Sequence, residues 1–326
     1  MLILNTEEQK SLIDMSEIIE YAAVALKEFS AERTVTPIRT ALPFHNGQNT
    51  ALVMPSVAEE LGGVGLKVVS VAPNNKHIGK KTINGVVMLS DFETGEPTAL
   101  LEGSFLTRIR TGALSGVATK YLSRQDSKKL CIVGTGAQAK GLVESVLAVR
   151  DIEEIFLFNR TEQKAQEFAE YIREKFDKVV QIYSDANEAV KEADIIVTTT
   201  TSSTPVFSEA LKPGVHVNAV GSFRPTMQEL PSHIMPSADK VVVESKEAAL
   251  EETGDLQVPI KEGLFNQEDI YGELGEIVSG EQEGRASDQE ITVFKSVGLA
   301  VVDIIVAQYF YSKATENKVG TNIQLS

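Results

Sequence analysis

The spacing of hydrophobic and polar residues divides the first third of the chain into distinct segments. Leu2 to Leu4 predict a short strand, and apolar residues from Met15 to Leu26 recur at helical spacing. From Thr36 to Leu101, short segments are separated by Asn-Gly, Gly-Gly and Thr-Gly-Glu turns, a pattern typical of a mostly antiparallel sheet. Its strands are expected at residues 48–55, 65–71, 85–91 and 97–102. A helix over residues 104–122 follows, and we place a domain boundary near residue 120.

The remainder of the chain alternates apolar strands with amphipathic helices. Strands are predicted at residues 130–133, 155–158, 179–183, 194–198, 215–220 and 240–243, and helices at residues 137–149, 162–175 and 185–191. A last long helix is expected over residues 292–311. Such alternation predicts a parallel sheet wrapped by helices. The expected fold class is α/β, with a Rossmann-type doubly wound parallel sheet and a second, α+β domain.

The first strand of this second part ends in a glycine-rich turn, KLCIVGTGAQAKG, over residues 129–141. Gly134, Gly136 and Ala139 have the G-x-G-x-x-A spacing of a dinucleotide-binding turn. Gly134 permits the tight turn, Gly136 lets backbone N–H groups approach a pyrophosphate, and Ala139 lets the helix lie close to the strand. An ordinary glycine turn is the alternative interpretation, but the strand-turn-helix setting favours the dinucleotide. The cofactor-binding residues expected here are Gly134, Thr135, Gly136, Ala137, Gln138 and Ala139.

The tip of the second strand indicates which dinucleotide binds. A carboxylate that accepts from the ribose 2′-OH is typical of NAD-binding sheets, but this chain has Asn159, Arg160 and Thr161 instead. Arg160 is suited to a 2′-phosphate, so NADP(H) is expected to be preferred, with NAD(H) as the alternative. A surface arginine at a helix start is the competing interpretation. Thr199 and Thr200 follow the fourth strand and are expected to face the dinucleotide, although a β-branched strand end explains them nearly as well.

Charge and composition exclude several classes of partner. The formal net charge is −15, which argues against binding to nucleic acid or to an anionic membrane. The N-terminus lacks the pattern of a signal peptide, and no apolar run approaches the ~18 residues of a membrane span, so we expect a soluble cytoplasmic protein. Cys131 lies in an apolar strand and is expected to be a core thiol. The four histidines show no metal-ligand spacing, and no metal is expected.

Six stretches together resemble the ornithine cyclodeaminase/mu-crystallin family over nearly the whole chain. They are TPIRT around Arg39, GVGLKVVS around Lys67, RIRTGALSGVATKYL around Arg110, GTGAQA, VNAVGSFRP around Gly221, and VFKSVGLAVVD near the end. The resemblance implies a substrate-binding and dimerisation domain of residues 1–120 with 305–326, and a nicotinamide-binding domain of residues 121–304. It also implies that the protein is a homodimeric enzyme that acts on a small imino acid or amino acid.

The resemblance also assigns residues to the substrate. Arg110 is expected to bind the substrate carboxylate through a bidentate contact, with Arg39 as a second candidate. Lys67 lies in an apolar strand, where an unpaired lysine is costly, and the matching lysine of the family faces the reacting centre. Burial and nearby arginine charges would lower its pKa and make it a proton donor or shuttle. Gly221 and Ser222 are expected to line the cofactor site.

One departure from the family pattern bears on the reaction. The cyclodeaminase and alanine dehydrogenase branches carry an Asp two residues after the glycine, but this chain has Phe223 there. Reduction of a preformed cyclic imine needs fewer proton transfers than deamination. We therefore expect a ketimine reductase, most simply one that converts Δ1-pyrroline-2-carboxylate to L-proline, with Δ1-piperideine-2-carboxylate as a second substrate and Phe223 against its ring.

Two alternatives remain open from the sequence. A cyclodeaminase or alanine-type amino-acid dehydrogenase would use Glu229 or Asp91 in place of the missing Asp. A binding protein without catalytic activity would bind NADPH and a small ligand but would not oxidise the cofactor.

Overall fold

The computed structural model describes residues 1–324 and divides into two compact units. Unit 1 contains Met1–Arg110 and the chain from Leu299 on, and unit 2 contains Thr111–Gly298. The boundaries thus fall after residue 110 and before residue 299, rather than at the expected residues 120 and 305. The difference arises because helix α3 (Gly103–Leu122) passes from one unit into the other, while helix α11 (Ala300–Asn317) belongs wholly to unit 1.

Unit 1 is built on a mostly antiparallel sheet, as predicted. Its strand order is β16-β1-β7-β6-β5-β4-β2, with β3 paired to β4, and only β1 and β7 are parallel neighbours. The strands are β1 (Leu2–Leu4), β2 (Thr34–Val35), β3 (Thr40–Phe44), β4 (Asn49–Ala58), β5 (Gly63–Val71), β6 (Ile83–Ser90), β7 (Pro97–Glu102) and β16 (Thr321–Asn322). The helices are α1 (Thr6–Lys10), α2 (Met15–Ser30) and α11, with short 3-10 turns at Glu59–Leu61 and Pro73–Ile78.

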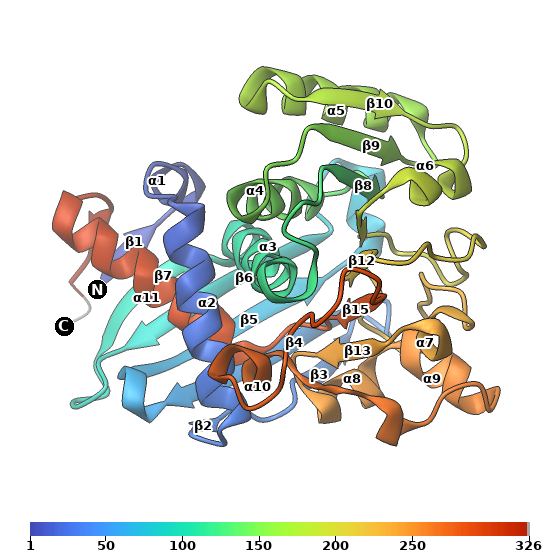
Figure 1. The fold of residues 1–326 in the computed structure, drawn as a ribbon. Helices are drawn as coiled ribbons and strands as arrows, with labels where there is room; N and C mark the ends of the chain where they lie inside the picture. The colour runs from blue at the N-terminus through green and yellow to red at the C-terminus, as the bar shows by residue number, and fades with distance from the viewer. Residues whose placement is uncertain (325–326) are drawn as a thin grey trace. The chain divides into compact units, whose positions relative to one another are not determined.

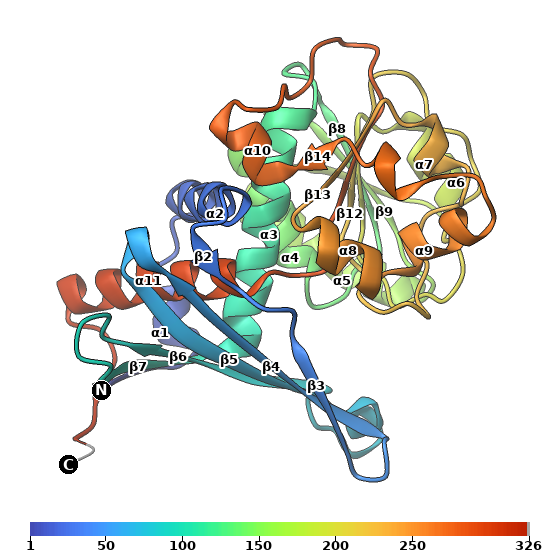
Figure 2. The ribbon, with the colours of Figure 1, turned by 90° about the horizontal axis from the view of Figure 1, so that it is seen from below.

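Helix α11 returns from the end of the chain to cover one face of this sheet. It packs on β4, β5 and β6 and beside α2, so the red and blue ends of the chain lie together in Figures 1 and 2. The approach to β5 is close: a Cβ on Gly65 would lie 2.8 Å from the Ile304 side chain. The same Cβ would lie 2.5 Å from the backbone oxygen of Met88 on β6, so only glycine fits there without displacing the neighbouring strand. The largely apolar first part of α11, Ala300–Phe310, follows from this position, because most of its residues are buried.

Unit 2 is a parallel sheet with the order β10-β9-β8-β11-β12-β15-β13-β14. The strands are β8 (Lys129–Val133), β9 (Glu154–Phe158), β10 (Val179–Ile182), β11 (Ile195–Thr198), β12 (His216–Ala219), β13 (Lys240–Val243), β14 (Gly272–Glu273) and β15 (Thr292–Lys295). The helices are α4 (Ala139–Val149), α5 (Glu162–Phe176), α6 (Ala186–Glu192), α7 (Ile234–Ser237), α8 (Lys246–Glu252), α9 (Gly254–Lys261) and α10 (Leu274–Ser279). The order reverses between β8 and β11, the switch point of a doubly wound sheet.

The prediction of a helix beginning at Thr292 was wrong for its first residues. Thr292–Lys295 form β15, which lies between β12 and β13. All four residues are buried, and the strand pairs on both sides. Gly298 then adopts a φ of +98°, which interrupts the chain before α11 begins at Ala300.

Alternate residues of β8 face two cores. Cys131 and Val133 pack into one hydrophobic cluster, and Leu130 and Ile132 pack into the other, on the opposite face of the sheet. The buried position of Cys131 agrees with the predicted core thiol, and burial raises the pKa of that thiol well above its usual range. Within residues 1–324, no helix combines the length and apolar character needed to cross a membrane.

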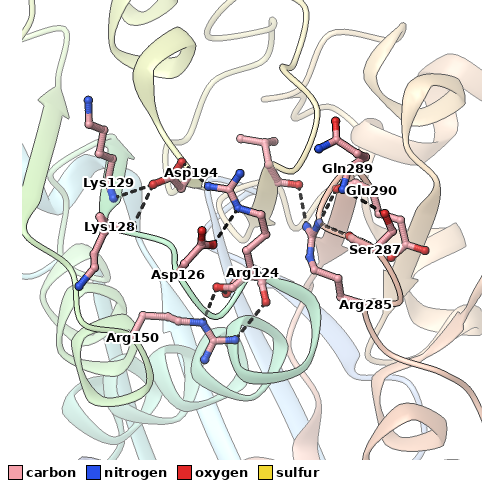
Figure 3. A network of polar contacts seen from close by, with 12 residues as sticks. Arg124, Asp126, Lys128, Lys129, Arg150, Asp194, Arg285, Ser287, Gln289 and Glu290 are labelled. Carbon is pink, nitrogen blue, oxygen red and sulfur yellow. Dashed lines mark hydrogen bonds and ion pairs between the residues drawn. The ribbon is translucent and has the colours of Figure 1, made fainter.

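The end of α3 is held within unit 2 by guanidinium groups (Figure 3). Arg150 donates to the carbonyl oxygens of Thr119, Lys120 and Ser123, and Arg285 donates to that of Leu122. Carbonyls in the last turn of a helix lack partners within it, so the two arginines cap the C-terminus of α3. Further acceptors, including the backbone carbonyls of Arg124, Val215 and Glu290, bind other N–H groups of the two arginines.

Candidate active site

The glycine-rich turn has the geometry expected of a dinucleotide site. Gly134 has a φ of +100°, and a Cβ there would lie 2.7 Å from the Thr200 side chain, so the turn requires glycine. By contrast, the nearest neighbour to a Cβ on Gly136 is the Thr199 carbonyl oxygen at 4.0 Å, which leaves space beside the backbone. Helix α4 begins directly afterwards at Ala139, which is fully buried.

Unsatisfied polar groups surround this turn. The Thr135 hydroxyl and the Gln138 side-chain carbonyl are buried, and neither has a hydrogen-bond partner in the part of the chain that the structure describes. Gln138 is the N-cap of α4 but its side chain does not cap the helix. The N–H of Ala139 donates to the carbonyl of Gly136, and the N–H groups that follow it in the first turn remain available to an anion. These residues therefore fit the pyrophosphate of a nicotinamide dinucleotide.

Asn159 joins this turn to the tip of β9. Its side-chain oxygen accepts from the N–H of Thr135 at 3.1 Å, and its amide donates to the carbonyl of Thr161 at 2.8 Å. Its neighbour Arg160 is exposed and forms no hydrogen bond or ion pair with residues 1–324. Asn159 thus has a structural role that the sequence did not reveal, while the guanidinium of Arg160 is available to a ligand.

A buried carboxylate joins the loops that follow β11 and β12. Glu229 accepts from the Thr198 hydroxyl at 3.1 Å and from the N–H groups of Thr200, Gly221 and Ser222 at 2.5, 2.7 and 3.1 Å. Glu229 is fully buried, and its own N–H donates to Asp255. Four donors therefore occupy this carboxylate.

Two further candidates from this region have defined surroundings. The hydroxyl of Ser222 donates to the Met227 carbonyl at 2.6 Å and lies 2.6 Å from the hydroxyl of Thr253, so it faces the loop interior. Phe223 is partly buried, and the guanidinium of Arg224 lies 5.6 Å from the centre of its ring. The structure therefore leaves an aromatic face, rather than a carboxylate, after Gly221.

The alternative bases considered from the sequence are both engaged elsewhere. Glu229 holds the loops after β11 and β12, as described above. Asp91 lies in the turn between β6 and β7 and accepts from the N–H and hydroxyl of Thr94 and the N–H of Glu93, and these bonds hold its pKa below the usual range. Neither carboxylate is arranged to serve as the missing Asp.

In unit 1, Lys67 and Arg110 meet at a third residue that the sequence analysis did not single out. The ammonium of Lys67 on β5 and the Nε of Arg110 on α3 donate to the same oxygen of Asp303 on α11, at 2.9 and 3.0 Å. Lys67 is 2% exposed, Arg110 6% and Asp303 0%. The predicted pair of cations is thus brought together around one buried carboxylate.

The pKa of Lys67 is lowered to about 8, because burial and the positive charges of Arg110 and Arg39 together outweigh the opposing effect of Asp303. The direction and its causes agree with the prediction for this lysine. Arg39 precedes β3 and is close enough to Lys67 for its charge to lower the pKa of that lysine. A proton donor with a pKa of about 8, in the field of two arginine charges, is suited to an anionic substrate that must be protonated.

A signal for Asp303 was present in the sequence. It is the last residue of VFKSVGLAVVD, and the only charge within the apolar run that begins α11. A lone carboxylate at such a position is expected to pair with buried cations. The sequence did not show which cations, because the contacts join residues 236 and 193 positions apart.

Comparison with known proteins identifies the family. Residues 1–318 match the model of the ornithine cyclodeaminase/mu-crystallin family. The chain belongs to this family. The expected family and α/β fold class are therefore confirmed.

Relatives within the family are similar over their full length. The chain is 70% identical to a Δ1-pyrroline-2-carboxylate reductase of Bacillus cereus, covering 99% of this chain and 100% of the relative. It is 34% identical to the ketimine reductase mu-crystallin of Rattus norvegicus, over 96% of each protein. The structure of the Thermococcus litoralis Δ1-pyrroline-2-carboxylate reductase in complex with NADH and L-proline is 39% identical, with a TM-score of 0.94, covering 99% of this chain and 100% of the other.

Proposed function

We propose that this chain is an NAD(P)H-dependent reductase of a cyclic ketimine acid. Its substrate is Δ1-pyrroline-2-carboxylate, which it reduces to L-proline, and Δ1-piperideine-2-carboxylate is a second substrate. The observation that carries the proposal is the buried group of Lys67, Arg110 and Asp303, which provides cations for a carboxylate and a titratable proton donor. The 70% identity to a named reductase of this type, over the full length, supports the same substrate.

The proposed reaction adds a hydride to the C=N carbon and a proton to the nitrogen. The nicotinamide cofactor supplies the hydride when it is bound. Arg110 binds the substrate carboxylate, with Arg39 as a second contact, and this fixes the ring in one orientation. Lys67 delivers the proton to the imine nitrogen, so the former double bond gains a C–H and an N–H bond. Phe223 packs against the ring of the substrate.

The deamination alternative lacks a supporting observation in this structure. Loss of ammonia needs a base aimed at water or at an amine. Glu229 accepts from four donors and Asp91 from three, so both carboxylates already have defined partners. A reductase needs no further base, because Lys67 alone supplies the proton.

A preference for NADP(H) over NAD(H) is part of the proposal. It rests on Arg160 at the tip of β9, whose guanidinium is exposed and unpaired among residues 1–324. No carboxylate is present at this tip to accept from a ribose 2′-OH. The glycine turn, Thr199 and Thr200 would hold the rest of the dinucleotide.

A homodimer in the cytoplasm completes the proposal. Strands β4 to β7 pair Pro55 with Leu66, Leu66 with Met88 and Met88 with Leu100, which places an apolar row across the sheet. This row faces away from α11, since Met54 and Lys67 on the other face are buried beneath the helix. Val86, on the same side as the row, is 42% exposed. An apolar sheet face of this kind is suited to a second copy of the chain.

A panel of substrates tests the proposed function. The purified protein is incubated with NADPH or NADH and with cyclic imines, with 2-oxo acids plus ammonia, or with ornithine plus NAD, and both cofactor absorbance and ammonia are followed. We expect fast NADPH oxidation with Δ1-pyrroline-2-carboxylate and no ammonia release from ornithine. Rapid ammonia release would support a cyclodeaminase instead. Tight NADPH binding without oxidation by any imine would support a binding protein.

A further inference from the structure

The carboxylate of Asp303 is arranged unevenly. One oxygen accepts from both Lys67 and Arg110, and the other oxygen is buried without a hydrogen-bond partner in the part of the chain that the structure describes. A carboxylate that served only to neutralise two cations would gain more by offering one oxygen to each. Instead, the ammonium of Lys67 and the guanidinium of Arg110 contact the same oxygen of Asp303.

The contact with Arg110 determines how this guanidinium can bind a substrate. Asp303 occupies the Nε–H, while the two terminal nitrogens form no hydrogen bond with residues 1–324. A guanidinium can bind a carboxylate through its two terminal nitrogens or through Nε and one of them. With Nε engaged, only the terminal pair remains, so Asp303 selects the orientation of the bound acid.

The contact with Lys67 determines the charge of the proton donor. The charged groups that act on Lys67 are Asp303 from α11, Arg110 from α3 and Arg39 before β3. Asp303 is the only one of them that favours the ammonium form, and it opposes burial and both arginines. Without Asp303, burial and the charges of Arg110 and Arg39 would all lower the pKa of Lys67 and favour its neutral form.

We propose that Asp303 is a positioning residue of the active site, which orients Arg110 for end-on binding of the substrate carboxylate and keeps Lys67 protonated to serve as the proton donor. The proposal rests on the function proposed above for Lys67 and Arg110. It adds that the reaction depends on Asp303 of helix α11, which neither binds the substrate nor transfers a proton.

The sign of the pH dependence follows from the chemistry. Imine reduction needs the protonated form of Lys67, so kcat/KM falls as pH rises through the pKa of about 8. Loss of the Asp303 charge lowers this pKa, so activity is lost at a lower pH. We expect a shift of about one pH unit or more, as is typical when a buried neighbouring charge is removed.

Asp303→Asn separates charge from shape. The side-chain oxygen of asparagine can still accept from Lys67 and Arg110, and its NH2 group occupies the corner that has no partner. The pKa of Lys67 is measured directly from its Cε resonance in protein labelled with 13C-lysine, assigned by its absence in Lys67→Arg. This readout needs neither substrate nor turnover. We expect a midpoint near pH 8 in the unaltered protein and a lower midpoint in Asp303→Asn, with the alkaline limb of kcat/KM moving by the same amount.

Glu28→Gln is the matched control, because Glu28 is a buried carboxylate of unit 1 that forms a two-point ion pair with Arg33. It removes the same charge and is expected to lower thermal stability without moving the Lys67 midpoint. An unchanged midpoint in Asp303→Asn would overturn the proposal and leave Asp303 with a structural role alone. If the midpoint moves but the unaltered protein reduces no cyclic imine, the proposed function fails while the role of Asp303 in charging Lys67 stands.

Asp303→Glu provides a second test that survives if the asparagine variant does not fold. It keeps the negative charge but displaces the carboxylate by one methylene. We expect the Lys67 midpoint to stay within about half a pH unit of its original value, and KM for Δ1-pyrroline-2-carboxylate to rise about tenfold because Arg110 is no longer held end-on. An unchanged KM would refute the orienting role.

Discussion

At the scale of single residues, the proposed chemistry depends on charges that are held in an apolar setting. Lys67 lies in a strand whose neighbours are hydrophobic, and Arg110 lies in a helix that is buried along most of its length. Cations in such places lose hydration, so each needs a partner. Asp303 serves both, and the cost of burial is offset by one shared carboxylate.

Arg160 allows a test of cofactor preference at the same scale. Arg160→Ala should raise KM for NADPH about tenfold or more and change KM for NADH less than about twofold, because only NADPH carries the 2′-phosphate that a guanidinium binds. Initial rates at saturating imine give both constants. Lys164→Ala, in the first turn of helix α5 just after Arg160, is the control for a general loss of positive charge. Equal effects of Arg160→Ala on the two cofactors would contradict the proposed role.

The sequence identified charged residues within short motifs as candidate site residues, but it did not show which residues they pair with. Lys67 and Arg110 stand out because a cation in an apolar segment is unusual and because their motifs resemble a family. Asp303 lies on a helix far along the chain, and nothing in local spacing shows that it reaches them. The same holds for Glu229, whose four donors come from separate loops and strand ends.

At the scale of elements, the parallel sheet is organised around its switch point. The loops after β11 and β12 are joined by backbone hydrogen bonds from Gln228 to Ser202 and from Val206 to Glu229. The Glu229 carboxylate adds to these, because it accepts N–H groups from both loops. Backbone groups that donate to one buried carboxylate are fixed relative to one another. The loop after β11, which borders the crevice where ligands bind in such sheets, is therefore fixed before any ligand arrives.

Glu229→Gln tests this role. The amide presents an NH2 group to backbone N–H donors, so at least one contact becomes repulsive and the loops separate. Hydrogen bonds to charged groups contribute about 1.5–3 kcal/mol each, so we expect the free energy of unfolding to fall by about 2–4 kcal/mol. We also expect Kd for NADPH to rise about tenfold or more, as measured by fluorescence titration.

Asp194→Asn is the control for this prediction. Asp194 directly precedes β11, at the other end of the strands, and its carboxylate binds Arg124 and the N–H groups of Lys128 and Lys129. It should lower stability without a comparable change in Kd for NADPH. A similar loss of NADPH affinity in both variants would mean that general destabilisation explains the result.

Element prediction succeeded where periodicity was sustained and failed where an apolar segment was short. Strands β1 and β4 to β7 of the antiparallel sheet and the first helices of the parallel sheet were located to within a few residues, whereas β2, β3 and β16 were not predicted. Thr292–Lys295 was assigned to a helix because a four-residue segment next to a helix has no period of its own. Its place between β12 and β13 is decided by pairing with strands that precede it by many residues.

At the scale of the whole chain, the apolar row on the sheet of unit 1 is the feature that single-chain packing leaves unexplained. Leu66 lies at its centre, between Pro55 and Met88. Leu66→Glu should convert a dimer into a monomer, because a carboxylate there would be buried without a partner in the dimer. Light scattering after size exclusion measures the mass directly.

Val179→Glu is the matched control, since Val179 is an exposed apolar residue on β10 of unit 2, with 65% of its surface accessible. It adds the same charge and should leave the mass unchanged. A dimer that persists in Leu66→Glu would show that another surface joins the subunits.

The discontinuity of unit 1 has a consequence for the order in which the protein is made. Residues 111–298 form one unit from an uninterrupted stretch, so this unit can fold as soon as it emerges from the ribosome. The sheet of unit 1 is synthesised first but must wait for α11, which supplies both its cover and Asp303. Until residue 303 is made, Lys67 and Arg110 lack this counter-charge, and the active site cannot assemble ahead of the finished chain.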